Sequence, residues 1–333
     1  MNRGLSIIET LAEKALFLLV NLAIAVSYPR QFYRYCRLSL PHGRIPIPAF
    51  PKSVNDKFFW RKVFDRDPRF PVVSDKIAVK QWIEDTGFGI KYARLLWTGT
   101  DATEIPPSLF DRKVVVKANH AAAMNIFVED DEIDRARIAR RANWFLKFDH
   151  GRPGAEWGYF SIPRTLLVEE GIDGLGPQLI ELNIYTFGTR ATLIVQYEEK
   201  TGPERVNFWI VGENDRLTAS DLRYGDPCPE SDEPPVANMD QALAIARLLG
   251  SKFDHVRVDL VSNQRDIWFC ELSLYSNTGL IADTGHDPES EESRAWDIRR
   301  SWFFTGPDKG GLTGLYARTL KRALDREEAS QNK

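Results

Sequence analysis

The sequence predicts an α+β fold, because short antiparallel strands alternate with helices along most of the chain. Two apolar, β-branched runs at 113–118 and 124–129 are separated only by a short turn, as in a pair of antiparallel strands. A second pair, 256–260 and 268–272, is joined by a polar turn near the C-terminal end. Between these two pairs, residues 131–147 carry apolar side chains at roughly helical spacing.

The first element along the chain is an apolar run over residues 15–26, which we expect to be helical. We expect it to be too short to cross a bilayer, since a crossing takes about 20 residues. Acidic residues precede it, unlike the positively charged start of a signal peptide. A basic and aromatic segment at 30–37 follows it. Two interpretations stay open: the helix packs against the main fold, or residues 15–37 make a peripheral contact with a membrane.

The remaining elements follow a proline-rich linker that ends at Pro51. A helix is expected over 74–86, with Ser74 as its N-cap, and another over 240–250. Further strands are predicted near 92–97, 165–170, 179–187, 191–197 and 205–211. Loops are expected at 150–163, long enough for a lid, and at 227–235, and a disordered polar tail from 326.

Composition narrows the class of protein. With 333 residues and 43% hydrophobic content, the chain can bury a large core. Its net charge of −3 argues against a nucleic-acid-binding protein, which usually carries a basic excess. The three cysteines, Cys36, Cys228 and Cys270, are too far apart in sequence for a disulfide framework or a zinc motif, which indicates a reducing cytoplasm. Strand alternation predicts that Cys270 is a packed core thiol facing away from Glu271.

Two carboxylates stand on the C-terminal hairpin. Asp259 lies on its first strand and Glu271 on its second, so the two can face each other across the ladder. Facing carboxylates repel unless a cation lies between them, and Mg²⁺ is the hard cation that prefers oxygen ligands. The alternative is a hairpin whose two carboxylates lie on its solvent face.

A lysine ends one of the upstream strands. The run at 113–118 brings Lys117 to its end, just before the turn 121–123, where a point charge and backbone amides could hold phosphates. The alternative is a solvated lysine. Farther on, the strand over 165–170 opens into a Gly-containing linker, a junction that can present backbone groups to an adenine edge.

The order of these parts resembles the ATP-grasp superfamily. Over roughly residues 50–285 the chain is similar to the TupA-like ATP-grasp family, which is associated with teichuronopeptide and other surface-polymer biosynthesis. The matching segments are 74–80, 114–120, 156–159, 162–164, 185–188 and 257–259, together with Glu271. The resemblance implies an ATP-grasp fold, two α+β subdomains gripping ATP, with an N-terminal helical extension. The expected division is an N-terminal helix and linker over 1–50, a preceding segment over 51–110, the ATP-grasp region over 111–325 and a tail over 326–333.

The same resemblance implies a site for ATP and Mg²⁺. The metal ligands it implies are Asp259, Glu271 and Ser273. The nucleotide contacts it implies are Lys76, Lys117, Asn119 and His120 near the phosphates and Glu169, Glu170 and Ile172 at the adenine. Lys117 and Arg257 are the expected catalytic residues. Arg257 stands two residues before Asp259 on a strand, so both side chains face the metal side, where Arg257 would stabilise an acyl phosphate. The alternative role for Arg257 is a salt bridge with Asp259 or Glu271.

The expected activity is an ATP- and Mg²⁺-dependent ligation of a carboxylate to an amine through an acyl phosphate, in surface-polymer biosynthesis. The partners are therefore a carboxylate and an amine donor, and no nucleic acid. Two alternatives use the same residues: a non-catalytic, membrane-peripheral binding protein of a polysaccharide assembly complex, or a kinase of a sugar or lipid hydroxyl. The expected location is the cytoplasm, with the inner face of the plasma membrane as an alternative.

Three departures from the family pattern keep the non-catalytic alternative open. Ala121–Ala123 replaces a Gly-Ser-Gly type of turn, and alanine does not adopt positive φ cheaply. Asn183 stands where the family tends to carry a lysine. Ser273 stands where many ATP-grasp enzymes have an asparagine, and the nearest amide is Asn277.

Overall fold

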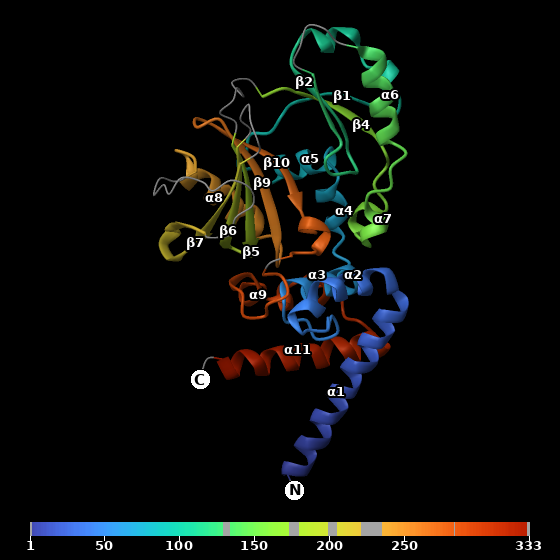
Figure 1. The fold of residues 1–333 in the computed structure, drawn as a ribbon, viewed down its shortest axis with the longest axis vertical. Helices are drawn as coiled ribbons and strands as arrows, with labels where there is room; N and C mark the ends of the chain where they lie inside the picture. The colour runs from blue at the N-terminus through green and yellow to red at the C-terminus, as the bar shows by residue number, and fades with distance from the viewer. Residues whose placement is uncertain are drawn as a thin grey trace. The chain divides into compact units, whose positions relative to one another are not determined.

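The computed structural model describes residues 2–128, 134–172, 180–198, 205–220, 235–282 and 284–331 as a mixture of helices and antiparallel sheets, which confirms the α+β class (Figure 1). The chain forms two compact units. The helical unit combines residues 1–67 with 275–333, and the two-sheet unit is continuous over 68–274. Helices from both ends of the chain therefore lie in one unit, whereas the expected boundaries at residues 50, 110 and 325 were drawn along the sequence.

The helical unit is assembled around α3, whose residues Phe58, Phe59 and Trp60 are buried. Its helices are α1 (Asn2–Ser27), α2 (Pro29–Ser39), α3 (Val54–Phe64), α9 (Glu291–Ala295), α10 (Trp302–Thr305) and α11 (Gly311–Gln331). The side chain of Ser53 caps α3 by accepting a hydrogen bond from the amide of Asp56. Trp60 Nε1 donates to Tyr316 Oη at 3.1 Å, which ties α3 to α11.

The C-terminal tail differs from the prediction. Helix α11 continues to Gln331, so residues 326–331 are helical rather than disordered. The physical reason is a tertiary ion pair, because Arg299 Nη1 lies 2.9 Å from Asp325 and 2.7 Å from Glu328. These ion pairs stabilise the polar C-terminal turns of α11, which the local sequence alone would not keep helical.

The N-terminal helix also differs from the prediction. Within α1, Thr10–Ser27 is long and apolar enough to cross a membrane by length and composition alone, so the expectation that the run is too short was wrong. The window Thr10–Ser27 reaches that length because it includes Glu13 and Lys14, the two charged residues that precede the expected apolar run. This criterion is weak by itself, since buried core helices and N-terminal signal sequences meet it as well.

The two-sheet unit contains a small sheet of four antiparallel strands in the order β1-β4-β2-β3. The strands are β1 (Leu95–Gly99), β2 (Val114–Ala118), β3 (Asn125–Val128) and β4 (Leu166–Glu170). Helix α6 (Arg135–Phe145) covers one face of this sheet (Figure 1). Alternate residues of β2, including Val114 and Val116, pack on that helix, which leaves Lys117 on the opposite face.

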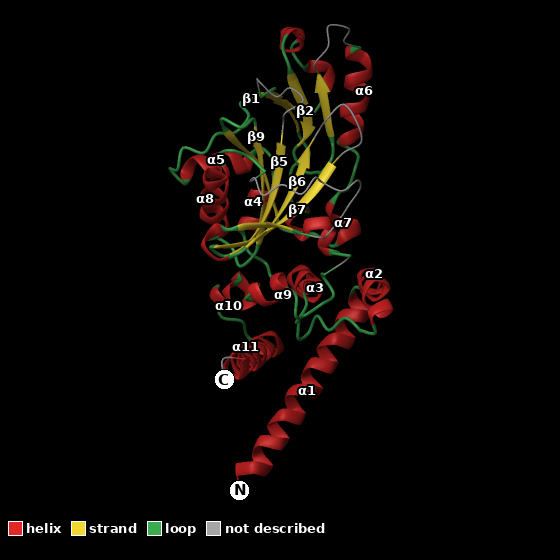
Figure 2. Ribbon diagram, turned by 60° about the vertical axis from the view of Figure 1, so that its left-hand side comes forward, coloured by secondary structure: helices red, strands yellow, loops and turns green. Residues whose placement is uncertain are grey.

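The larger sheet has six antiparallel strands in the order β10-β9-β5-β6-β7-β8. The strands are β5 (Ile180–Phe187), β6 (Arg190–Glu198), β7 (Arg205–Val211), β8 (Leu217–Ala219), β9 (Val256–Ser262) and β10 (Ile267–Ser273). Helix α8 (Met239–Gly250) packs against one face, across β5, β6 and β9 (Figures 1 and 2). Val256, Val258 and Leu260 of β9 are buried, and Arg257 and Asp259 alternate with them to face the other side.

The segment before the small sheet contains two short helices in place of the single one expected over 74–86. They are α4 (Arg69–Ser74) and α5 (Ala78–Asp85). Ser74 is not the N-cap, because Asp75 adopts an extended backbone and its Oδ1 accepts from the amides of Ile77 and Ala78. The expected lid loop contains α7 (Gly151–Gly154) and a short turn of 3₁₀ helix at Trp157–Tyr159. Residues 131–133 of the predicted helix and 227–234 of the predicted acidic loop lie outside the described residues.

Candidate nucleotide and metal site

The two carboxylates of the hairpin meet as predicted. Asp259 on β9 and Glu271 on β10 are direct partners in the antiparallel register. The hydroxyl of Ser273 lies 3.3 Å from Asp259 Oδ2 and 3.4 Å from Glu271 Oε1. The structure therefore brings all three predicted metal ligands onto one face of the large sheet.

Cys270 corrects the prediction. The ladder shifts register between Phe269 and Glu271, so Cys270 is the extra residue of a β-bulge opposite Asp259. It is solvent-exposed rather than packed in the core. The bulge breaks the strict alternation on which the prediction relied and sets Glu271 opposite Asp259.

Each carboxylate already has an internal cation. Arg257 grips Asp259 through two contacts of 2.6 Å, Nε to Oδ1 and Nη2 to Oδ2, and donates to Ser273 Oγ at 3.1 Å. Lys76, which precedes α5, forms a short ion pair with Glu271. Arg257 and Lys76 therefore neutralise the two facing carboxylates. For a metal ion to bind, at least one of these cations would need to move away or share its carboxylate oxygens with the metal.

The two carboxylates differ in acidity. Burial raises the pKa of Asp259 to about 7, although the charge of Arg257 opposes the rise. Burial acts on Glu271 too, but Lys76 more than offsets it and lowers the pKa of Glu271 to about 2. Glu271 is thus ionised at any physiological pH, and Asp259 is the member of the pair whose charge responds to its surroundings.

Lys117 reaches the same region from the small sheet. Its Nζ lies 2.6 Å from Oε2 of Glu169, a diagonal neighbour on the adjacent strand β4. Lys80, on α5, binds the other oxygen of Glu169 at 2.9 Å and the carbonyl of Ala93 at 2.8 Å. Burial disfavours the charge of Lys117, but Glu169 and, farther away, Glu271 raise its pKa above the ordinary value. The opposing lysines likewise lower the pKa of the buried Glu169 against the effect of burial.

Lys80 was missed by the sequence analysis. The one available signal is its position four residues after Lys76, which would place two cations on one face of a continuous helix. That helix is interrupted at Asp75–Ile77, so the spacing alone was not sufficient.

Glu170 and Ile172 do not join this cluster. The Glu170 carboxylate is bound by Arg94 at 3.0 and 2.9 Å on the surface. Alternation along β4 explains this, since Glu169 and Glu170 must face opposite sides of the sheet. Ile172 is half-buried just beyond β4. The side chains of Glu169 and Glu170 therefore face opposite sides of the small sheet, and the adenine contacts expected from this segment would have to come in part from its backbone groups.

Asn119 has a structural role that the sequence did not predict. Its Nδ2 donates to Asp75 Oδ1 at 3.1 Å and to the carbonyl of Pro163 at 2.9 Å, while its Oδ1 accepts from the amide of Thr165 at 2.9 Å. These bonds use both ends of the amide, so Asn119 joins the segments around the site. Its own carbonyl accepts from the amide of Lys76 at 3.1 Å, which positions that lysine.

His120 is buried beside Asn119. Its Nε2 lies 3.1 Å from the carbonyl oxygen of Phe148, and burial lowers its pKa. It lines a small cavity of about 50 Å³ with His150, Arg152 and Arg164. His120 is therefore held by protein groups next to the Lys117 strand.

The backbone of the turn after His120 is strained at one of its alanines. Ala123 has a φ of +56°, in the left-handed region that glycine adopts without penalty. The loop thus keeps a shape suited to glycine at this position. Asn183 contributes in a different way. Its side-chain oxygen faces only acceptors, so we assign the amide with its oxygen and nitrogen exchanged, and in that orientation the nitrogen donates to Glu181 at 3.1 Å and to Asp259 at 3.2 Å.

The donor set suits a hard cation. Two facing carboxylates and a hydroxyl offer oxygen atoms, which Mg²⁺ prefers, and Mg²⁺ is usually held by only one or two protein carboxylates together with phosphate and water. In the part of the chain that the structure describes, no three His, Cys, Asp or Glu side chains group to hold a metal ion. The remaining ligands would therefore come from a bound nucleotide and solvent.

Over residues 56–290 the chain matches the model of the TupA-like ATP-grasp family. The chain belongs to that family. Its fold is accordingly the ATP-grasp fold, with α1 as an N-terminal helical extension, as the sequence predicted.

Solved structures show distant similarity to this TupA-like protein. D-alanine–D-alanine ligase from Bacillus anthracis is 15% identical, with a TM-score of 0.36, over 77% of this chain and 69% of that chain. The ATP-grasp ligase PsnB, complexed with a precursor variant, Mg and ADP, is 13% identical, with a TM-score of 0.36, over 80% and 66%. N5-carboxyaminoimidazole synthase from Aspergillus clavatus is 14% identical, with a TM-score of 0.39, over 77% and 56%. A search of the curated proteins finds no match.

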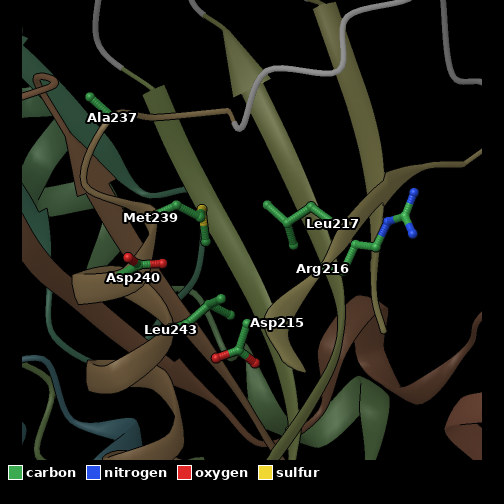
Figure 3. Close-up of a pocket in the computed structure, with 7 residues that line it drawn as sticks. All are labelled: Asp215, Arg216, Leu217, Ala237, Met239, Asp240 and Leu243. Carbon is green, nitrogen blue, oxygen red and sulfur yellow. The ribbon is translucent and has the colours of Figure 1, made fainter. Parts of the chain in front are cut away.

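A wider hollow lies elsewhere in the two-sheet unit. Its volume is about 590 Å³, and Figure 3 shows it between the segment of Asp215–Leu217 and the start of α8, where Met239 and Leu243 point into it. It shares no lining residue with the Asp259–Glu271 pair. The size of this hollow therefore does not bear on the chemistry of the candidate site.

Proposed function

We propose that this protein is an ATP- and Mg²⁺-dependent carboxylate–amine ligase. The observation that carries the proposal is the register pairing of Asp259 with Glu271, with Arg257 on the same strand face and Lys117 opposite on the small sheet. The terminal phosphate of a nucleotide is where charge moves during phosphoryl transfer. Two facing carboxylates could hold a cation there, and the fixed guanidinium beside them could stabilise that charge.

The lysines would exchange partners when a nucleotide binds. The ion pairs of the site join four basic side chains to three carboxylates, and the charge of a further carboxylate, Glu181 on β5, also acts on Asp259. Lys117 and Lys80 share the single carboxylate of Glu169, so one of them can turn to a phosphate while the other keeps Glu169 paired. This exchange avoids leaving any buried charge alone.

Asp259, Glu271 and Ser273 are the residues that would hold Mg²⁺, and the bound ion would neutralise charge on the phosphate oxygens. In the reaction, a carboxylate oxygen of the acceptor forms a bond to the terminal phosphorus as the bond from that phosphorus to ADP breaks. An amine nitrogen then bonds to the acyl carbon, inorganic phosphate leaves, and the nitrogen loses a proton. Arg257 would orient the acyl phosphate with its planar fork of donors.

We assign the reaction to the synthesis or modification of a surface polysaccharide or teichuronopeptide-type polymer. The support for this assignment is the family to which residues 56–290 belong. The reaction would take place in the cytoplasm, where ATP is available and where unpaired thiols such as Cys36 and Cys270 stay reduced.

Nucleotide binding without turnover is the second candidate function. Two features favour it: the strained Ala123 in the loop after His120, and the neutral Asn183, where the family resemblance leads us to expect a lysine. A lysine there would add a cation beside Asp259, which Asn183 cannot replace.

The test is an ATP-consumption screen of the full chain with amino acids, uronic acids and their mixtures. We expect phosphate release only when both a carboxylate and an amine are present, and loss of that release in Glu271→Gln. Glu170→Gln removes a carboxylate of the same type on the surface and should keep full activity. Magnesium-dependent ATP binding without any turnover would favour the second candidate, and release with a hydroxyl acceptor alone would indicate a kinase.

A further inference from the structure

Helix α1 uses one of its faces to pack on the helical unit. Phe17 and Ile24 are buried there, and the ring of Phe17 stacks on Phe50 with centroids 5.0 Å apart. Asn21 Oδ1 accepts from the amide of Ala49 at 3.4 Å on the same side. This face of α1 is therefore fixed against protein.

The opposite face of α1 is apolar and exposed. Its large side chains and their exposed fractions are Leu11 61%, Leu18 62%, Leu19 64%, Leu22 55% and Val26 80%. At 3.6 residues per turn these positions fall within roughly 100° of the helix circumference, on the side away from Phe17 and Ile24. We call these five residues the leucine stripe; at 1.5 Å per residue it is about 23 Å long. A contiguous apolar surface of this kind marks an interaction site rather than scattered exposed residues.

The residues around the stripe favour a lipid surface. Between residues 10 and 44 the chain has five lysines and arginines and one acidic residue, against a net charge of −3 for the whole chain. That acidic residue, Glu13, is bound to Arg326 at 2.6 Å. Helix α2 follows directly and exposes Arg30 and Arg37, with the ring of Tyr33 62% exposed. Basic and aromatic side chains at the end of an apolar helix match the headgroup region of an anionic bilayer.

We propose that α1 lies in the surface of an anionic phospholipid membrane, with the leucine stripe in the acyl region and Arg30 and Arg37 at the headgroups. The helix lies in the interface rather than crossing the bilayer, because crossing would separate Phe17, Asn21 and Ile24 from their protein partners. A second copy packed in parallel along the stripe would bring two basic α2 helices together, which like charges oppose. This proposal does not depend on the proposed ligase activity.

The test is co-sedimentation of the full chain with vesicles of phosphatidylcholine, alone or mixed with phosphatidylglycerol. We expect binding to the mixed vesicles that weakens as salt is added. The triple variant Leu18→Gln/Leu22→Gln/Val26→Gln should bind at least about 1,000-fold more weakly, since burial of each of the three side chains is worth about tenfold or more. Arg30→Gln/Arg37→Gln should lose the preference for phosphatidylglycerol.

The matched control is Phe127→Gln/Trp144→Gln, which removes exposed apolar side chains of the two-sheet unit and should bind vesicles as the wild type does. Circular dichroism and thermal unfolding should show that all variants fold, because each residue of the stripe is more than half exposed. The proposal would be overturned if the wild type did not bind vesicles, or if the control variant lost as much vesicle binding as the triple variant. Resistance of the bound protein to carbonate extraction would show a spanning helix instead. A dimer in sedimentation velocity that the stripe variant abolishes, without vesicle binding, would show that a second copy covers the stripe.

Discussion

Replacing Glu169 with glutamine should destabilise the protein and at the same time increase its stabilisation by nucleotide. The side chain of Glu169 is 6% exposed and holds Lys117 at 2.6 Å and Lys80 at 2.9 Å. Without its charge, two ammonium groups are left close together and unpaired. Breaking a buried ion pair by removing one partner costs about 3–5 kcal/mol. Lys80 and Lys117 keep 12% and 22% of their side-chain surface in contact with solvent, so we expect the lower end, about 3 kcal/mol.

The assay is equilibrium unfolding in denaturant together with thermal unfolding. For a domain of this size, about 3 kcal/mol corresponds to a fall in Tm of roughly 6–12 °C. Mg-ATP should reduce the difference in Tm between Glu169→Gln and wild type, because phosphate oxygens replace the missing carboxylate beside the lysines.

Glu170→Gln is the matched control for this prediction. The control removes the adjacent carboxylate, whose partner Arg94 is 65% exposed, and such surface pairs are worth about 0–1 kcal/mol. Equal destabilisation by the two substitutions would refute the burial argument. A difference in Tm that Mg-ATP leaves unchanged would show that Lys80 and Lys117 do not contact the nucleotide.

Three further predictions concern the metal end and the loop. Arg257→Lys should keep Mg-ATP affinity within a few-fold in calorimetry and lower turnover by about 10²–10³, because lysine cannot reproduce a two-pronged contact; unchanged turnover would place the acceptor elsewhere. Mg²⁺-dependent nucleotide binding should strengthen as pH rises through about 7, since protonated Asp259 is the poorer ligand and ionises in that range; a flat pH profile, or an equal rise in Asp259→Asn, would contradict this. Ala123→Gly should raise the free energy of unfolding by about 1 kcal/mol in denaturant titration, because glycine adopts a φ of +56° without strain; a loss of stability would show that the alanine methyl packs favourably.

The sequence was sufficient for features that depend on local pattern. The two strands of the hairpin and their antiparallel pairing follow from two apolar runs and a short turn, whereas the register that sets Glu271 opposite Asp259 also needs the bulge at Cys270. The side of the sheet on which Arg257 lies follows from alternation alone. The family resemblance then gave these residues their expected partners, ATP and Mg²⁺.

Features that depend on irregular or tertiary structure escaped prediction. A one-residue bulge at Cys270 has no sequence signal, and it exposed a thiol that alternation placed in the core. The cap at Asp75 interrupts a continuous helical pattern, which also hid Lys80. The last turns of α11 are held by Arg299, some 26 residues before Asp325 in sequence, so local polarity could not reveal them.

The central claim is that Asp259 and Glu271 together hold Mg²⁺ for a bound nucleotide. Its most direct test is calorimetric titration of the full chain with ATP, with and without Mg²⁺, in wild type and in Asp259→Asn/Glu271→Gln. A suitable control is Asp266→Asn, at the exposed turn of the same hairpin, where the carboxylate pairs only with Lys91 at 2.5 Å among the ion pairs described. We predict Mg²⁺-dependent binding in wild type and Asp266→Asn, and loss of the Mg²⁺ dependence in the double variant. ATP binding in wild type that does not depend on Mg²⁺, or Mg²⁺-dependent binding that is unchanged in a folded double variant, would contradict the claim.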